Sequence, residues 1–214
     1  MIVTIDGPAG TGKSTVARRL AEELGFDYLD TGAMYRMLGL KVVEAGVDPT
    51  VAGPVAEVAS TTSIELADGR WLLDGVDVTD RLRTPEVTLA ASLIAQISEV
   101  RRVLVDLQRE FSRNRNVVCE GRDQGTVVFP HAEFKFFLTA QPEERARRRH
   151  AELASQGQEV DFATLLREQT ARDQRDEVRA VAPLRAAADA RQIDTTNSSI
   201  EDVVAQLVSY VNGR

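Results

Sequence analysis

The chain has 214 residues and a formal net charge of −7 at neutral pH, with 43% hydrophobic and 28% charged residues. These values are typical of one soluble globular domain with its own core, and the acidic balance argues against a general nucleic-acid binder. No apolar run approaches the roughly 18 residues that span a bilayer. The single cysteine, Cys119, excludes an internal disulfide and is typical of a reducing compartment. We therefore expect a cytoplasmic protein that binds neither membranes nor nucleic acid.

Strands and helices alternate in the first part of the chain. An apolar run at residues 2–5 predicts a strand, and a glycine-rich turn follows it. Apolar residues at helical spacing predict a helix over 14–24, which Gly25 ends. A second short strand is expected over 26–29 and a second helix over 35–44.

The middle of the chain predicts a small antiparallel unit. Residues 64–67 and 71–73 are apolar runs that flank Asp68-Gly69-Arg70, which is a hairpin signal. With residues 76–78 they predict an antiparallel insertion in the core. A single long helix is expected over 87–113.

The last part of the chain returns to alternating elements. In chain order we expect strands at 117–119 and 134–138, a helix from Pro142 broken near Gly157, a helix at 161–179, a strand at 192–194 and a helix at 200–211. This alternation indicates an α/β protein, in which a mostly parallel sheet carries helices on both faces. We expect a single domain over residues 1–214.

The segment Gly-Pro-Ala-Gly-Thr-Gly-Lys-Ser at residues 7–14 matches the phosphate-loop pattern G-x-x-x-x-G-K-[ST] at every fixed position. Glycines let backbone N–H groups point at phosphate oxygens, and the following helix adds its positive end. We expect Lys13 to reach the outer phosphates and the Ser14 hydroxyl to bind Mg²⁺. A glycine-rich turn without a ligand is the weaker interpretation, because a strand precedes the motif and a helix follows it. The expected ATP-binding residues are Gly7, Pro8, Ala9, Gly10, Thr11, Gly12, Lys13, Ser14 and Thr15.

Phosphate loops occur in small-molecule kinases, GTPases and mechanical ATPases. A GTPase would normally carry an Asn-Lys-x-Asp segment, but no asparagine here precedes a lysine. Mechanical ATPases usually need a larger sheet and oligomer contacts. The small size of the chain favours a small-molecule kinase with ATP as the phosphate donor.

A first candidate for binding the acceptor is the segment Asp-Thr-Gly-Ala-Met-Tyr-Arg at residues 30–36, which ends the second predicted strand. Ligands gather at the carboxyl ends of parallel strands, so Thr31 and Arg36 could face the phosphate loop. The alternative is a helix cap at Asp30 or Thr31, with Arg36 on the surface.

A second candidate is the charged segment at residues 120–126, which follows the predicted strand at 117–119. Glu120 or Asp123 could orient Mg²⁺-bound water, and Arg122 could bind a phosphate. An ordinary charged turn is the alternative.

A third candidate is the helix face that carries Arg172, Asp176 and Arg179 at helical spacing. Such a face can hold a phosphate, but acid–arginine pairs at this spacing also occur on solvated helices. The same two interpretations apply to an upstream cationic face formed by Arg145, Arg148 and Arg149.

Taken together, these motifs resemble those of the bacterial cytidylate kinases, which transfer a phosphate from ATP to CMP or dCMP. The resemblance runs nearly end to end and is most specific at residues 5–15, 29–36, 121–130 and 172–184. It implies a five-stranded parallel core, an acceptor-binding insertion at about 60–82 and a helical lid at about 145–175. Gln124 stands where the family is expected to have methionine, which leaves the local packing open.

The resemblance also implies roles for individual residues. Ser92 and Arg101 would recognise the cytosine, and Asp176 would lie near the sugar. The implied CMP-binding residues are Thr31, Arg36, Ser92, Arg101, Arg122, Asp123, Arg172, Asp176 and Arg179. The implied catalytic residues are Lys13, Arg122, Arg172 and, from the lid, Arg149.

We therefore expect a monomeric enzyme with ATP and CMP or dCMP as substrates and Mg²⁺ as cofactor. Two alternatives remain open. The acceptor could be UMP, AMP or a non-nucleotide alcohol, or the protein could be a nucleotide-switched binding protein with negligible turnover.

Overall fold

The structure is a computed structural model that describes residues 1–67, 69–155 and 157–213. The chain forms two compact units. The first unit combines Met1–Leu29 with Ser112–Arg214, and the second unit is Asp30–Phe111.

A five-stranded parallel sheet lies at the centre of the first unit, as expected. Its strand order is β2-β6-β1-β7-β8. The strands are β1 (Ile2–Asp6), β2 (Asp27–Asp30), β6 (Val117–Gly121), β7 (Phe134–Thr139) and β8 (Arg191–Asp194). The central strand β1 pairs with β6 on one side and with β7 on the other, both in parallel. Its carboxyl end therefore carries the phosphate loop out at the middle of the sheet.

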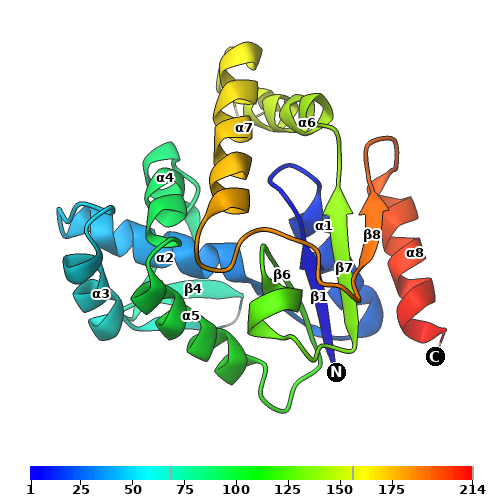
Figure 1. The fold of residues 1–214 in the computed structure, drawn as a ribbon, viewed down its shortest axis with the longest axis horizontal. Coiled ribbons are helices and arrows are strands. Elements are labelled where there is room, and N and C mark those ends of the chain that lie inside the picture. Colours follow the sequence, from blue (N-terminus) through cyan, green and yellow to red (C-terminus); the bar gives the residue numbers. More distant parts are fainter. Residues whose placement is uncertain (68, 156, 214) are drawn as a thin grey trace. The chain divides into compact units, whose positions relative to one another are not determined.

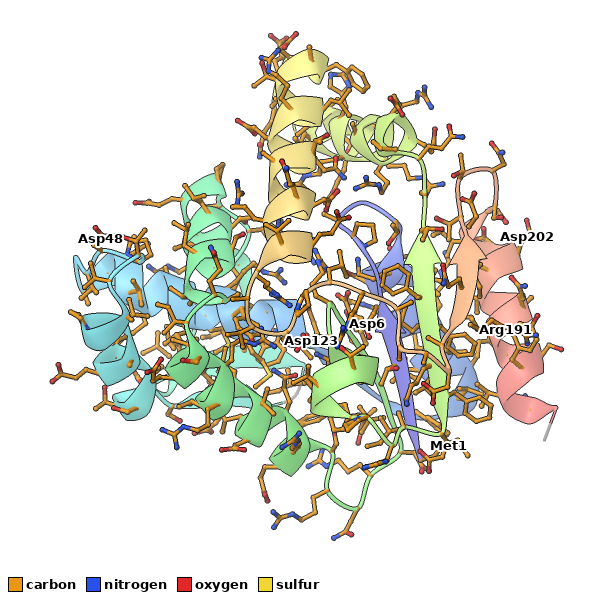
Figure 2. All side chains as sticks on the ribbon, in the orientation of Figure 1. Met1, Asp6, Asp48, Asp123, Arg191 and Asp202 are labelled. Atoms are coloured by element: carbon orange, nitrogen blue, oxygen red, sulfur yellow. The ribbon has the colours of Figure 1, made fainter. Side chains whose placement is uncertain are left out.

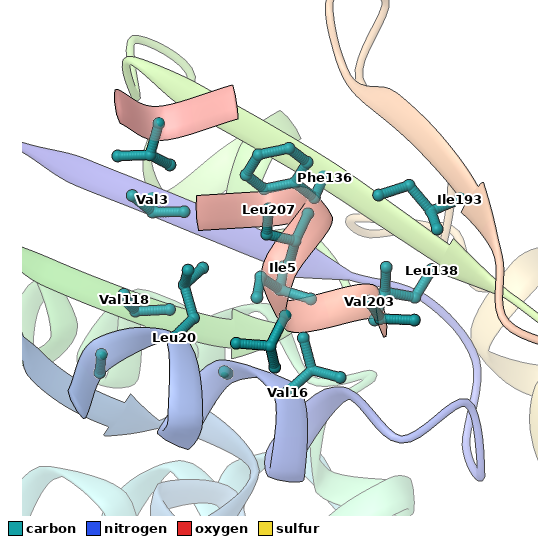
Figure 3. Packing of buried hydrophobic residues seen from close by; sticks show 14 residues of the cluster. Val3, Ile5, Val16, Leu20, Val118, Phe136, Leu138, Ile193, Val203 and Leu207 are labelled. Carbon is teal, nitrogen blue, oxygen red and sulfur yellow. The ribbon is translucent and has the colours of Figure 1, made fainter. Parts of the chain in front are cut away.

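Two helices of the first unit pack on one face of this sheet. They are α1 (Lys13–Leu24) and α8 (Ile200–Asn212). Side chains alternate between the faces of a strand, so Val3 and Ile5 point to the same side. There they meet Leu20 and Leu207 in a core whose members are almost completely buried (Figure 3). This apolar layer fixes α1, and with it the loop from which α1 begins.

The opposite face of β1 and β7 is more polar. Thr4 and Lys135 point to this side, where a single π-helical turn, Gln124–Val128, packs against them. The Lys135 ammonium group donates to the Pro130 carbonyl at 2.6 Å and to the Asp189 carboxylate at 2.7 Å. Lys135 thereby ties the segment after β6 and the coil before β8 to the sheet.

Two further helices complete the first unit. Helix α6 (Pro142–Ser155) follows β7, and α7 (Phe162–Val178) packs against it (Figure 1). The Asp161 side chain caps α7 by accepting from the Thr164 N–H at 2.8 Å. The predicted break near Gly157 is confirmed, because α6 ends before it and α7 begins after it. Residue 156 of the predicted lid lies outside the described residues.

The second unit contains the predicted antiparallel insertion. A three-stranded sheet is formed by β3 (Ile64–Ala67), β4 (Arg70–Leu73) and β5 (Val76–Asp77). It confirms the predicted hairpin, although residue 68 of its turn lies outside the described residues. The accompanying helices are α2 (Thr31–Glu44), α3 (Ala52–Thr61), α4 (Pro85–Ile94) and α5 (Ser98–Phe111), with a short 3₁₀ turn at Thr79–Arg81.

The single long helix predicted over 87–113 is wrong. Helix α4 ends at Ile94, and α5 begins at Ser98. The Ile97 N–H donates to the Ile94 carbonyl at 3.0 Å, which closes a tight turn between the helices. Neither glycine nor proline marks this break in the sequence, and Ile94 and Val100 on its two sides are both completely buried.

The contact between α2 and α4 depends on Gly39. A Cβ at this position would lie 2.9 Å from the Ala91 backbone nitrogen and 3.2 Å from the Val87 carbonyl oxygen. We expect Gly39→Ala to lower the free energy of unfolding in urea by about 1–3 kcal/mol, because the helices must move apart. Gly53→Ala is the matched control, since a Cβ there meets nothing within 4 Å in the helix α3. It should leave stability unchanged or raise it by up to about 1 kcal/mol; equal losses in both variants would contradict the prediction.

Candidate active site

The phosphate loop has a backbone that suits glycine. Gly7, Gly10 and Gly12 have φ angles of 144°, 78° and 86°. A Cβ on Gly7 would lie 2.1 Å from the Leu138 carbonyl oxygen, so the loop runs directly against β7. Only glycine combines this conformation with so close an approach.

Lys13 is the buried lysine of the loop. Lys13 is 5% exposed. Its Nζ donates to the Pro8 carbonyl at 2.6 Å and to the Thr11 hydroxyl at 3.4 Å. Burial and the nearby Arg122 guanidinium lower the pKa of Lys13 to about 7. An anionic ligand such as a phosphate would stabilise the charged form of Lys13 and raise its pKa.

This pKa leads to a prediction about protons. At pH 8 the free protein holds Lys13 mostly neutral, whereas the phosphates of ADP are ionised, as phosphate monoesters are above about pH 6. Bound ADP raises the pKa of Lys13, so binding should take up a substantial fraction of a proton. Titration calorimetry in buffers of different ionisation enthalpy measures this uptake. In Lys13→Met the uptake should disappear, and an unchanged uptake would assign it to another group.

Ser14 and Glu120 place two oxygens next to each other beside the loop. The Ser14 hydroxyl donates to the Glu120 carboxylate at 2.5 Å, and the Tyr28 hydroxyl donates to the same oxygen at 3.4 Å. In the described part of the chain no group of three or more His, Cys, Asp or Glu side chains could hold a metal ion alone. The Ser14–Glu120 pair nevertheless fits Mg²⁺, which binds oxygen ligands and usually takes few of them from the protein.

Helices α6 and α7 both contact the loop at Ala9. The Arg145 guanidinium donates to the Ala9 carbonyl at 3.0 Å, and the Gln169 amide donates to the same oxygen at 2.8 Å. The Ala9 N–H donates to the Asp173 carboxylate at 3.2 Å, and Asp173 also pairs with Arg145. Gln169 and Asp173 are not among the predicted site residues, and helical spacing predicts only the cationic face that includes Arg145.

The predicted charged segments at 120–126 and 172–179 meet within the first unit. The Arg122 Nε lies 3.0 Å from the Asp176 carboxylate, and the residues are nearly buried. Burial disfavours the charged form of Arg122, but the Asp176 and Glu120 carboxylates outweigh it and raise its pKa. Because Asp176 is 7% exposed, the alternative of a solvated helix face is wrong for this residue.

A second acid–arginine pair lies alongside. The Asp123 carboxylate is 3.8 Å from the Arg179 guanidinium, and both side chains are almost completely buried. The Arg179 Nε also donates to the Ala182 carbonyl at 2.5 Å, which holds the coil after α7. The alternative of an ordinary charged turn is therefore wrong for Asp123.

The remaining predicted arginines differ in position. Arg172 lies close enough to Lys13 for its charge to lower the lysine pKa. Arg149 instead pairs with Glu152 on its own helix at 2.8 Å, and its side chain is 37% exposed. The structure therefore brings Arg172 to the loop but leaves Arg149 on the surface of α6.

In the second unit, Asp30 and Arg36 form a pair at the start of α2. The Asp30 carboxylate accepts from the Ala33 N–H at 2.8 Å, so the interpretation of Asp30 as a helix cap is right. The expectation that such a cap leaves Arg36 on the surface is wrong, because its side chain is 19% exposed and lies 3.0 Å from Asp30. The Arg36 Nε has no hydrogen-bond partner among the described residues, so it is available to a ligand.

Three other predicted residues of this unit are buried polar groups. Thr31 is 2% exposed, Ser92 is 8% exposed and Arg101 is 4% exposed. The Ser92 hydroxyl has no partner within the described ranges, and the Arg101 guanidinium lies 5.8 Å from the centre of the Tyr35 ring. Buried polar groups are costly unless they are hydrogen-bonded, so Ser92 is expected to gain a partner when a polar ligand binds.

Comparison with known proteins identifies the family. A protein-family model for cytidylate kinase matches residues 3–213. The chain belongs to the cytidylate kinase family. A curated cytidylate kinase of Pelotomaculum thermopropionicum is 51% identical over 98% of this chain and 95% of its own length. One from Mycobacterium leprae is 48% identical over 100% of this chain and 96% of its own length.

Solved structures support the fold assignment. A shikimate kinase from Bacteroides thetaiotaomicron superimposes with a TM-score of 0.52 at 14% identity, over 99% of this chain and 98% of its own. An uncharacterised protein from Eubacterium ventriosum gives a TM-score of 0.56 at 12% identity, over 100% and 99% of the two chains. At these identities the likeness concerns the fold alone. Among the described residues, every helix is too short or too polar to span a bilayer.

Proposed function

We propose that the protein is a cytidylate kinase, which transfers the γ-phosphate of ATP to CMP or dCMP and yields ADP and CDP or dCDP. Its membership of the cytidylate kinase family along nearly the whole chain carries this proposal. The buried Lys13 beside a glycine-built loop supports phosphate chemistry at that end of the sheet.

The phosphate loop holds the donor. Its backbone N–H groups and the start of α1 face the phosphates of ATP, and Lys13 binds the outer ones. Ser14 and Glu120 are the residues that would hold Mg²⁺. When bound, Mg²⁺ neutralises charge on the nucleotide phosphates. Together, the loop residues Gly7 to Thr15 fix the direction from which the γ-phosphate is presented.

CMP is bound in this proposal by the polar and charged side chains that the resemblance implies. They are Thr31, Arg36, Ser92, Arg101, Arg122, Asp123, Arg172, Asp176 and Arg179. Ser92 and Arg101 recognise the cytosine, Asp176 contacts the sugar, and arginines bind the phosphate. Two-pronged pairing makes arginine well suited to that last task.

The chemical step is a direct in-line transfer between two aligned nucleotides. Catalysis of this kind consists mainly of alignment and of stabilising charge on the transferring group. Lys13, Arg122 and Arg172 supply that charge, and Arg149 joins them if the segment at about 145–175 closes as a lid and excludes water. The acceptor phosphate is already an anion, so a strong general base is unnecessary.

The setting of the enzyme is also part of the proposal. We expect a monomer in the reducing cytoplasm, with an acceptor-binding insertion at about 60–82 and no nucleic-acid partner. The low cysteine content and acidic charge support this expectation.

A coupled assay of ADP release tests the function. CMP, dCMP, UMP, AMP, GMP and shikimate are each offered with ATP, and CMP and dCMP should give the highest kcat/KM. Preference for another acceptor would overturn the cytidine specificity. ADP release that does not depend on any acceptor would overturn the assignment as a kinase and favour a nucleotide-switched binding protein.

A further inference from the structure

The carboxylate of Asp6 is buried at the end of β1, directly before the phosphate loop. Asp6 is 4% exposed. One of its oxygens accepts from the Gln124 N–H at 2.9 Å, and the other accepts from the Gly125 N–H at 2.8 Å. Asp6 and Asp123 lie close together beside the π-helical turn Gln124–Val128 (Figure 2). Both carboxylate oxygens are therefore used to hold the backbone of a segment that is distant in sequence.

Burial of this carboxylate is unfavourable by itself. Burial raises the pKa of Asp6 to about 7, although the two backbone N–H groups act in the opposite direction. Leucine or valine at the end of a buried strand would avoid this penalty. The hydrogen bonds from the Gln124 and Gly125 N–H groups are therefore the structural reason for a carboxylate at this position.

The segment that Asp6 holds carries two residues of the proposed acceptor site. Arg122 and Asp123 immediately precede the bonded N–H groups, and the Asp123 carbonyl accepts from the Val127 and Val128 N–H groups of the π-helical turn. Arg122 in turn pairs with Asp176. A shift of this turn would therefore move both Arg122 and Asp123, which the proposed function assigns to CMP binding.

The turn also has little freedom on its other side. A Cβ on Gly125 would lie 3.1 Å from the Thr4 hydroxyl and 3.3 Å from the Lys135 side chain. Lys135 is held by Pro130 and Asp189, so it cannot easily give way. The turn is therefore fixed by the Asp6 carboxylate and by close packing on β1 and β7.

We propose that Asp6 is a positioning residue for the acceptor nucleotide: by accepting from the Gln124 and Gly125 N–H groups it holds Arg122 and Asp123 in place for CMP. This inference rests on the proposed function. It assigns Asp6 to the acceptor half of the reaction, although Asp6 is adjacent in sequence to the donor-binding loop.

The variant Asp6→Asn tests this role at pH 8. The asparagine keeps the shape but replaces one acceptor oxygen by an NH₂ group, which cannot accept from a backbone N–H. We expect the dissociation constant of CMP, measured by titration calorimetry, to rise about tenfold or more, while that of ADP changes less than about threefold. The matched control is Asp48→Asn, because Asp48 also accepts from a backbone N–H, of Thr50 at 2.9 Å, at an exposed position. Both affinities should be unchanged in the control.

A second variant keeps the inference testable if Asp6→Asn fails to fold. Gly125→Ala leaves Asp6 intact but displaces the same turn, and it should also weaken CMP binding selectively. Equal weakening of CMP and ADP, or unchanged CMP binding in a folded variant, would overturn the role of Asp6. Failure of the wild-type protein to bind CMP would instead overturn the proposed function, so the two failures are distinguishable.

Discussion

The variant Lys13→Met is expected to lower the kcat for CMP phosphorylation about 10²-fold or more. Lys13 is the buried lysine of the phosphate loop, and its Nζ is held within the loop by Pro8 and Thr11. Removing it takes a positive charge from the transferring phosphate, where water is excluded and charge stabilisation is strong. Steady-state kinetics with saturating ATP and CMP measure the loss.

Loss of fold is not expected to explain this result. Burial lowers the pKa of Lys13 to about 7, far below that of a free lysine, so the folded state gains nothing from its charge. Lys13→Met should therefore melt at the same temperature as the wild type or higher. Lys41→Met is the matched control, because Lys41 pairs with Asp74 at a partly exposed position. Near-normal turnover in folded Lys13→Met would contradict a catalytic role.

The variant Arg36→Met is expected to weaken CMP binding about 10²-fold and ADP binding very little. Arg36 is nearly buried beside Asp30, and its Nε has no partner among the described residues. A guanidinium in this state can make a charge-assisted pair with the acceptor phosphate, which is roughly twice as strong as a neutral hydrogen bond. Titration calorimetry with CMP and with ADP measures the two affinities separately.

The control for this variant is Arg81→Met in the same unit. Arg81 also pairs with a carboxylate, that of Glu44, but its side chain is 52% exposed. It should leave both affinities unchanged. Asp30 keeps its bond to the Ala33 N–H when Arg36 is removed, so α2 should stay capped. Equal losses for CMP and ADP would place Arg36 outside the acceptor site.

Local patterns were sufficient for the strands and for the phosphate loop. The apolar run at 117–119 predicts a buried strand, and β6 is that strand extended to Gly121. Glycine at residues 7, 10 and 12 predicts a loop that curls around phosphate, and all three have positive φ angles. These features depend on side chains within a few residues of each other, so a single sequence contains them.

The errors concern elements whose limits depend on distant contacts. The break between α4 and α5 carries neither glycine nor proline, and α3 was not predicted at all. The turn at Gln124–Val128 is too short to show a period, and it is held by Asp6 from another strand. Such features are stabilised by packing between segments, which local propensity does not contain.

Patterns of neighbouring residues were enough to predict the α/β fold, the phosphate loop and the resemblance to cytidylate kinases. Which charged side chains are buried together became visible only in the folded chain. Helical spacing treats Arg145, Arg148 and Arg149 alike, yet only Arg145 is buried, where it contacts Ala9 and pairs with Asp173. The physical reason is that a motif is a relation between neighbours in the chain. Burial and the nearby Arg122 charge lower the pKa of Lys13, and two backbone N–H groups hold Asp6; all of these depend on neighbours in space.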